Sequence, residues 1–274
     1  MPLSSNGTAY LLSGEKHNPV VVLIHGLGVN NNMWRDFIPR LSQQFQVLTY
    51  DLFGHGESAE PLSVPSLTMF SDQLKSLLEF LGIEVASIVG YSLGGMINRR
   101  FTMDYPERVQ SLVILNSPHE RSREQQQIIE SRVKRTSKGG PAATMETSLK
   151  RWFTPEFVLA ENDVVNDVRE WILSNNPLWY TQCREVLANG VCELIRPNPP
   201  ISTPTLVMTC ENDTGSTPAM AHAIAKEITG SQVQIIPHLL HLGLMEKPTY
   251  FLDPIENFLK ISLARHRSNI PLEI

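Results

Sequence analysis

Short runs of apolar, mostly β-branched residues alternate along the chain with longer stretches in which apolar residues recur at helical spacing. The runs contain few polar positions, as expected for strands that helices cover on both faces of a sheet. The predicted strands are residues 20–24, 45–50, 85–89, 109–115, 205–208 and 233–236. This alternation predicts an α/β fold with a mostly parallel, doubly wound sheet.

One crossover helix is clear between the second and third predicted strands. Its apolar residues are three or four positions apart and are Phe70, Leu74, Leu77, Leu78 and Leu81. This spacing places them on one face of a helix. We expect that face to pack on the sheet rather than to bind a ligand.

The alternation stops between His119 and Thr203, where roughly 85 residues separate two strand signals. A simple crossover needs far fewer residues, and the segment contains several amphipathic helical patterns. We therefore predict an inserted helical cap. The expected domains are a core of residues 1–118 and 201–274 and a cap of residues 119–200.

Composition limits the classes of function. The chain has 274 residues, of which 42% are hydrophobic and 19% are charged, as in an ordinary globular protein. The net charge of -5 includes no basic stripe, so we expect no nucleic-acid partner. No leader-like start and no run of 18 uncharged apolar residues are present, which favours a cytoplasmic protein without membrane contact. The three cysteines indicate neither a disulfide framework nor a metal site.

The candidate chemistry begins at residues 90–94, which read Gly-Tyr-Ser-Leu-Gly. They follow a predicted strand and precede a helical stretch. A nucleophile at such a sharp turn needs small flanking residues, which Gly90 and Gly94 provide. The N-terminus of the following helix favours negative charge that develops next to it. We expect Ser92 to be a nucleophile.

A serine nucleophile needs a base, and the base needs a third group to orient it. In the chain order serine, acid, histidine, both partners follow Ser92. His238 and His241 fall on the loop after the last predicted strand. Asp213 and Glu211 follow the strand before it. These residues alone leave both choices open.

At this point the sequence resembles the α/β-hydrolase family, over nearly the whole chain outside the cap. In residues 241–248 a Glu and a Pro follow His241 as they do after the catalytic histidine of that family. The resemblance implies His241 as the base and Asp213 as the acid. Some members carry the acid after the strand that ends here near Leu115, where this chain has only Asn116, Ser117 and then Glu120.

Two further loops are similar to loops of that family. Residues 25–28, His-Gly-Leu-Gly, match the loop that provides one half of an oxyanion hole. The resemblance implies the backbone N–H groups of Leu27 and Leu93 as the two donors. Residues 51–58 resemble a structural loop, so we expect Asp51 and His55 to build a turn.

The implied reaction is acyl transfer to Ser92 followed by hydrolysis, which needs no metal or organic cofactor. Residues 151–157 of the predicted cap, with Trp171 and Tyr180 beyond them, resemble the cap of 3-oxoadipate enol-lactonases. The expected partner is a small ester or lactone. We expect Arg151, Trp152 and Tyr91 to contact it.

Two other functions remain open. A C–C bond hydrolase uses the same three catalytic residues, and a ligand receptor can use the same scaffold without turnover. A dehalogenase of this fold is disfavoured because it carries Asp at the position of Ser92.

The predicted cap is locally basic within an acidic chain. Its first part holds four acidic residues, Glu120, Glu124, Glu130 and Glu146, and eight basic ones, Arg121, Arg123, Arg132, Lys134, Arg135, Lys138, Lys150 and Arg151. Most of these charges are expected on a solvated helix face. Arg151 lies beside Trp152 and Phe153, and a guanidinium held in this way can pair with a carboxylate. We therefore expect an acidic substrate.

Overall fold

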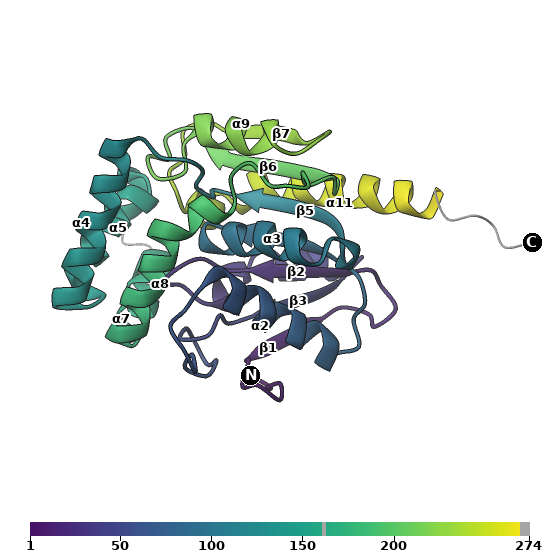
Figure 1. Ribbon diagram of the computed structural model, residues 1–274, viewed down its shortest axis with the longest axis horizontal. Helices are drawn as coiled ribbons and strands as arrows, with labels where there is room; N and C mark the ends of the chain where they lie inside the picture. The colour runs from purple at the N-terminus through teal and green to yellow at the C-terminus, as the bar shows by residue number, and fades with distance from the viewer. Residues whose placement is uncertain (161–162, 269–274) are drawn as a thin grey trace, which may run out of the picture.

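A seven-stranded sheet forms the centre of the computed structural model, which describes residues 1–160 and 163–268. Its order is β1-β3-β2-β4-β5-β6-β7, and only β1 runs antiparallel to its neighbour (Figure 1). The strands are β1 Tyr10–Ser13, β2 Val20–Ile24, β3 Gln46–Tyr50, β4 Ala86–Tyr91, β5 Val109–Leu115, β6 Thr205–Cys210 and β7 Gln232–Ile236. The predicted doubly wound α/β class is confirmed, and each predicted strand agrees with an observed one to within two residues.

The edge strand β1 was missed in the sequence. It pairs with β3 through four residues, and its two central side chains, Leu11 and Leu12, are exposed. A short strand at the edge of a sheet is not buried on both faces and so lacks the continuous apolar run of the inner strands. Its apolar residues therefore gave no strand signal.

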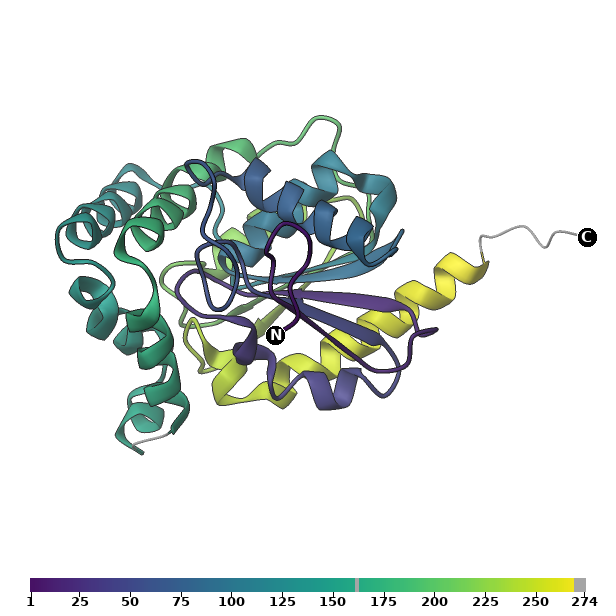
Figure 2. The ribbon, with the colours of Figure 1, turned by 90° about the horizontal axis from the view of Figure 1, so that it is seen from below.

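Helices cover both faces of the sheet (Figure 2). The helices α2 Leu67–Phe80 and α3 Leu93–Asp104 pack together on one face, and α9 Pro218–Lys226 contacts β6 and β7. The other face carries α1 Ile38–Leu41 and the long α11 Pro248–Ser268. The short elements are η1 Asn31–Trp34, η2 Pro106–Arg108, η3 Gly190–Glu193 and α10 Gly243–Glu246. The predicted crossover helix corresponds to α2, in which Phe70, Leu74, Leu77 and Leu78 are buried as expected. Leu81, the fifth residue of the predicted apolar face, follows the last residue of α2 and is half-buried.

Five helices lie between β5 and β6 in the described part of the sequence and gather at the carboxyl ends of the parallel strands (Figure 1). They are α4 Arg123–Gly139, α5 Ala142–Trp152, α6 Pro155–Leu159, α7 Asp163–Ser174 and α8 Pro177–Asn189, together called the helical insertion. Buried side chains such as Leu149, Phe153 and Tyr180 join the same hydrophobic cluster as the sheet. The domain boundaries at residues 118–119 and 200–201 stay a prediction, and residues 161–162 and 269–274 of the predicted domains lie outside the described residues.

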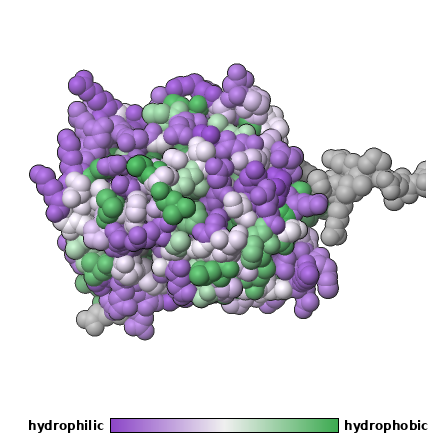
Figure 3. Space-filling model, turned by 60° about the horizontal axis from the view of Figure 1, so that its bottom comes forward, coloured by the Kyte–Doolittle hydropathy of each residue, from purple (hydrophilic) through white to green (hydrophobic). Residues whose placement is uncertain are grey.

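The surface carries only scattered apolar groups on the face seen in Figure 3, where small apolar areas are separated by polar ones. Scattered apolar side chains are normal for the surface of a folded protein. Within residues 1–160 and 163–268, no helix has both the length and the apolar composition that crossing a bilayer requires. The cytoplasmic location stays a prediction.

Candidate active site

Ser92 occupies the turn between β4 and α3, with a φ of 54° and a ψ of -108°. The positive φ points the side chain away from the strand, at a conformation that a non-glycine residue rarely adopts. A Cβ at Gly90 would lie 2.2 Å from the Gly94 carbonyl oxygen, and one at Gly94 would lie 2.3 Å from that of Ile24. Both glycines are therefore required for the backbone segments to approach so closely.

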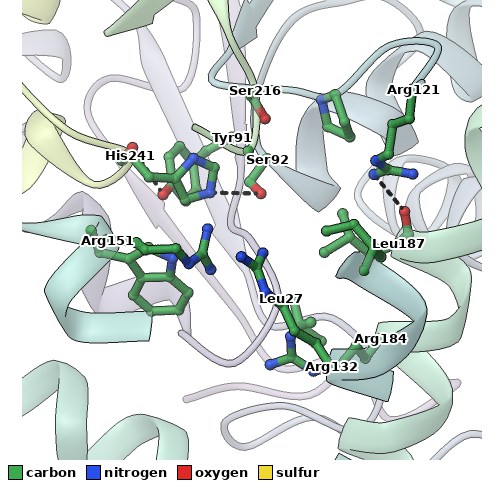
Figure 4. A pocket seen from close by; sticks show the side chains of 14 residues that line it. Leu27, Tyr91, Ser92, Arg121, Arg132, Arg151, Arg184, Leu187, Ser216 and His241 are labelled. Carbon is green, nitrogen blue, oxygen red and sulfur yellow. Dashed lines mark hydrogen bonds between the residues drawn. The ribbon is translucent and has the colours of Figure 1, made fainter. Parts of the chain in front are cut away.

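His241 lies on the loop between β7 and α10 and faces the serine (Figure 4). Its Nε2 is 3.1 Å from Ser92 Oγ, and its Nδ1 is 2.6 Å from Asp213 Oδ2. With Nδ1–H donating to the carboxylate, Nε2 is the acceptor for the serine hydroxyl. The tertiary structure thus brings together three residues that lie far apart in the sequence.

Asp213 is fully enclosed in the loop after β6. Its Oδ1 accepts hydrogen bonds from the backbone N–H groups of Gly215 and Ser216, and its Oδ2 accepts one from Asn116 Nδ2 at 2.9 Å. Burial acts to raise the pKa of this carboxyl, but His241 and these donors outweigh burial and hold the pKa below its ordinary value. Asp213 is therefore a carboxylate at neutral pH.

Asn116 is a site residue that the sequence did not identify as one. It follows β5, where some α/β-hydrolases carry the acid, and its amide holds the carboxylate provided by the next strand, β6. Its position after β5 was the one sign of this role in the sequence. The contact with Asp213 follows only from the fold, which brings the ends of β5 and β6 side by side.

The alternative base and acid contact each other instead of Ser92. The backbone N–H of His238 donates to Glu211 Oε2 at 2.9 Å, and the His238 ring lies 3.7 Å from the same oxygen. The His238 side chain is 90% exposed, and Glu211 is also exposed. The geometry therefore favours His241 and Asp213 over this surface pair.

The two predicted backbone donors flank the serine. Leu93 is the first residue of α3, so its N–H has no acceptor within the helix. Leu27 lies on the loop after β2 and lines the same pocket as Ser92. A Cβ on its neighbour Gly26 would lie 3.3 Å from the Ser92 Cβ, so this loop packs directly against the serine turn.

The helical insertion is attached to the loop that carries the histidine. His241 N–H donates to the Arg151 carbonyl at 3.4 Å, and Leu242 N–H donates to the Trp152 carbonyl at 2.9 Å. Glu246 accepts hydrogen bonds from the backbone and hydroxyl of Thr154. The Glu that follows the histidine therefore helps to fix the end of α5 against the core.

Tyr91 and Trp152 lie next to the histidine ring as well as in the pocket. The Tyr91 hydroxyl donates to the His241 carbonyl at 3.1 Å, and the Tyr91 and Trp152 rings lie 5.3 Å and 6.1 Å from the imidazole. Both residues line the pocket, as does Arg151. All three predicted substrate contacts thus surround the Ser92 site, and their contact with a substrate stays a prediction.

The pocket in front of Ser92 is narrow, with a volume of about 50 Å³. Four arginines line it and reach it from the helical insertion and the segment before it (Figure 4). They are Arg121 before α4, Arg132 on α4, Arg151 on α5 and Arg184 on α8. Burial lowers the pKa of Arg121 and Arg132 to about 10, which leaves both guanidinium groups charged at neutral pH.

Three of these arginines were not singled out in the sequence. The basic excess of the predicted cap included Arg121 and Arg132 but did not separate them from solvated neighbours, and Arg184 lay outside that segment. In the described residues no group of three or more His, Cys, Asp or Glu side chains is arranged to hold a metal ion. Besides Ser92, Ser216, Tyr91 and His241, the polar side chains that line the pocket are the four guanidinium groups.

The whole chain is similar to known hydrolases. It is 25% identical over 252 residues to 3-oxoadipate enol-lactonase 2 of Acinetobacter baylyi, covering 92% of each chain. It is 27% identical over 251 residues to the (E)-2-((N-methylformamido)methylene)succinate hydrolase of the same organism, covering 90% of this chain and 93% of that one.

Solved structures give the same result. The enol-lactonase from Burkholderia xenovorans superimposes with a TM-score of 0.84 at 25% identity, over 92% of this chain and 96% of that one. A family model described as the alpha/beta hydrolase fold matches residues 19–248. The chain therefore belongs to the alpha/beta-hydrolase family and is related to 3-oxoadipate enol-lactonase.

Proposed function

We propose that this protein is a serine hydrolase that cleaves a small ester or lactone with an anionic acyl part. The observation that carries the proposal is the continuous chain of hydrogen bonds from Ser92 Oγ through His241 to Asp213. A hydroxyl becomes an effective nucleophile when a base oriented in this way removes its proton.

The proposed reaction has two steps. Ser92 Oγ attacks the substrate carbonyl and forms the acyl–oxygen bond while His241 Nε2 takes the hydroxyl proton. The leaving alkoxide or enolate departs with that proton. Water then attacks the acyl-enzyme and gives a proton to His241. His241 passes this proton to Ser92 Oγ as the acyl–oxygen bond breaks and the carboxylic acid is released. Asp213 stabilises the imidazolium in both steps.

The proposed oxyanion hole consists of the N–H groups of Leu27 and Leu93. Negative charge develops on the carbonyl oxygen only during the reaction, so donors fixed in place beforehand favour the transition state over the substrate. One such donor contributes about 10²- to 10³-fold in rate. The packing of Gly26 against the serine turn supports this assignment because it fixes the distance between the two donors.

The preference for an anionic substrate is supported by Arg151, which lines the pocket beside Trp152. In the described residues its guanidinium makes no ion pair within salt-bridge distance, so it is available to a substrate carboxylate. The names of the relatives point the same way, since 3-oxoadipate enol-lactone and the succinate derivative are both acids. An acidic lactone is therefore the first substrate to test.

A panel of neutral aryl esters, saturated lactones, enol-lactone acids and an aryl dienoate tests the proposal. We expect Ser92-dependent hydrolysis of esters or lactones and labelling of Ser92 by a fluorophosphonate probe, located by peptide mass spectrometry. Ser92→Ala should lower the rate by about 10⁶-fold, as loss of the nucleophile does in a comparable triad, while the thermal transition is retained.

Labelling at another residue, or near-native hydrolysis by Ser92→Ala, would overturn the proposal. Turnover of the dienoate alone would instead identify a C–C bond hydrolase. Tight binding of the panel compounds without turnover would identify a receptor.

A further inference from the structure

The four pocket arginines lack carboxylate partners. Arg121, Arg132, Arg151 and Arg184 all line the Ser92 pocket, and none forms a salt bridge with any Asp or Glu that the structure describes. Several arginines elsewhere in the described residues are paired: Arg40 contacts Asp253 and Glu256, Arg100 contacts Asp104 and Glu193, and Arg169 contacts Glu146. The buried Arg99 also lacks a salt bridge, but its hydrogen bonds go to acceptors within the core. The pocket is therefore a local excess of positive charge.

Several N–H donors in the cluster are buried without an acceptor. The Nε atoms of Arg121 and Arg184 are enclosed and unpaired. Among the described residues, the guanidinium groups of Arg132 and Arg151 have no hydrogen bond at all. A buried donor without a partner destabilises the fold, and an unpaired buried charge does so more strongly. Such groups are expected where a ligand supplies the missing acceptors.

Two of the arginines are held in place by neutral groups. Arg121 donates to the carbonyl oxygens of Leu187 and Ala188 at 3.1 Å and 3.0 Å. Arg184 donates to the Tyr180 hydroxyl, and its guanidinium lies 5.0 Å from the centre of the same ring. These contacts fix the side chains without neutralising them, which lowers the entropy lost when an anion binds.

The arginines are distributed along a path that leads away from Ser92. Arg121 and Arg132 line both the Ser92 pocket and an adjacent hollow of about 270 Å³ between α4 and the loop before α9. Arg151 and Arg184 line only the inner pocket. Figure 4 shows Arg121 well apart from Arg151, with Arg132 and Arg184 also facing the space near Ser92. The positive charge therefore has an inner part, Arg151 and Arg184, and an outer part, Arg121 and Arg132.

We propose that the substrate is a dianion, with one carboxylate bound by Arg151 and Arg184 and the other by Arg121 and Arg132. This inference rests on the proposed function of Ser92 and adds a second anionic group to it. Each carboxylate has two oxygens and can accept hydrogen bonds from two guanidinium groups. One carboxylate alone would leave half of the cluster without a counter-charge.

The narrow pocket requires side chains to move when such a molecule binds. Its volume of about 50 Å³ is smaller than a diacid. Within the described part of the chain, the guanidinium groups of Arg132 and Arg151 have no hydrogen bond that must break first. Arg132 lies where the pocket meets the outer hollow. A shift of Arg132 toward the hollow would open the path and bring its charge to the outer carboxylate.

Titration calorimetry on Ser92→Ala protein tests the inference without turnover. The probes are succinate, glutarate and adipate, each compared with its monoamide, which has the same length and one charge less. We expect at least one diacid to bind about tenfold or more tightly than its monoamide, which corresponds to about 1.4 kcal/mol. Adding Arg132→Gln should reduce that preference to less than about threefold, because it weakens diacid binding more than monoamide binding.

Arg135→Gln is the matched control, because Arg135 is exposed on the same helix and should leave the preference intact. Arg132→Lys keeps the charge and should retain part of the preference, which separates a role of charge from a defect in folding. Equal binding of diacid and monoamide for all three lengths would overturn the inference, as would equal losses in Arg132→Gln and Arg135→Gln.

The proposed hydrolase function is measured separately, by hydrolysis of neutral phenyl acetate and by labelling of Ser92 in the native protein. Hydrolysis without a diacid preference overturns only the dianion inference. A diacid preference without Ser92-dependent hydrolysis overturns only the hydrolase.

Discussion

The core side and the helical-insertion side of the Ser92 pocket differ in how their polar groups are paired. On the core side, Ser92, His241 and Asp213 form a continuous hydrogen-bonded chain, and Asn116 donates a further hydrogen bond to the Asp213 carboxylate. On the insertion side, four guanidinium groups face the same pocket, and none has a carboxylate partner among the residues that the structure describes. The polar groups of the core side are paired within the protein, whereas we expect those of the insertion side to be paired only when an anion binds.

This difference suggests that the core side carries out the reaction and that the insertion side determines which substrate is preferred. Groups that are fully hydrogen-bonded before the substrate arrives need no reorganisation during the reaction, which suits transition-state stabilisation. Unpaired donors favour a ligand that satisfies them over a neutral one, because a buried donor left unpaired is unfavourable. We therefore expect changes on the core side to lower the rate for every substrate. Changes on the insertion side should alter which substrate is preferred.

The largest effect is expected at the base. His241→Ala removes the only imidazole that contacts Ser92 in the described structure and should lower kcat by about 10⁴- to 10⁶-fold, since members of a triad act as a unit. His238→Asn is the control, because His238 is exposed and has a φ of 63°, which Asn tolerates. Steady-state kinetics on a neutral ester measures both variants. Equal losses would mean that the two histidines are not distinguished by their distance from Ser92.

The second largest effect is expected at the acid, Asp213. Asp213→Asn keeps the shape of the side chain but removes the charge that holds the histidine tautomer, and the corresponding change in a serine-protease triad lowers kcat by about 10⁴-fold. Glu211→Gln makes the same chemical change at an exposed position of the same loop and should have little effect on kcat. A larger loss in Glu211→Gln than in Asp213→Asn would transfer the role of acid to Glu211.

A third effect concerns stability on the core side. His25 is fully buried, donates through Nδ1 to the Gly26 carbonyl and accepts at Nε2 from the Leu52 N–H. Burial lowers its pKa to about 4, although the hydrogen bond to Gly26 acts in the opposite direction. The unfolded chain, with an ordinary pKa of about 6.5, therefore binds the proton first as the pH falls.

This stabilisation is present above about pH 6.5 and should be lost as the pH falls toward about 4, by about 3 kcal/mol in the free energy of unfolding. Urea unfolding curves between pH 8 and pH 4 measure the loss. The same curves for His17→Gln, at an exposed position, should match the native protein. His25→Gln should reduce the loss by the part that comes from His25 and keep the part that comes from His55, whose pKa burial lowers to about 3. If the free energy of unfolding of His25→Gln depended on pH as strongly as that of the native protein, the loss of stability would come from groups other than His25.

The smallest effect is expected on the insertion side, at Arg151. Arg151→Met should raise KM for an acidic lactone or ester about tenfold, the value of one charge-assisted hydrogen bond of about 1.4 kcal/mol, and leave a neutral ester of similar size unchanged. Lys150→Met removes the same charge from the exposed neighbouring position and is the control. Equal loss for both substrates would contradict a selective role for this side of the pocket.

The residues of the core side were easier to predict from the sequence than those of the insertion side. Ser92 and its glycines could be found because the strand, the sharp turn and the helix are adjacent in the sequence, so that local steric rules apply. Arg121 and Arg184 could not be found in this way. Arg121 lies before α4 and Arg184 lies on α8, and only the packing of these two segments shows that both side chains line the Ser92 pocket.

The sequence by itself determined six of the seven strands, β2 to β7, because continuous apolar runs are stable only when helices cover both faces, but it did not reveal the edge strand β1. It also predicted Ser92 as the nucleophile and, by resemblance, His241 and Asp213 as its partners. The tertiary structure decided the contacts between distant segments: Asn116 on Asp213, Glu246 on Thr154 and the arginines around the pocket. Such contacts depend on where strand ends and inserted helices meet in space, which local propensity and spacing do not encode.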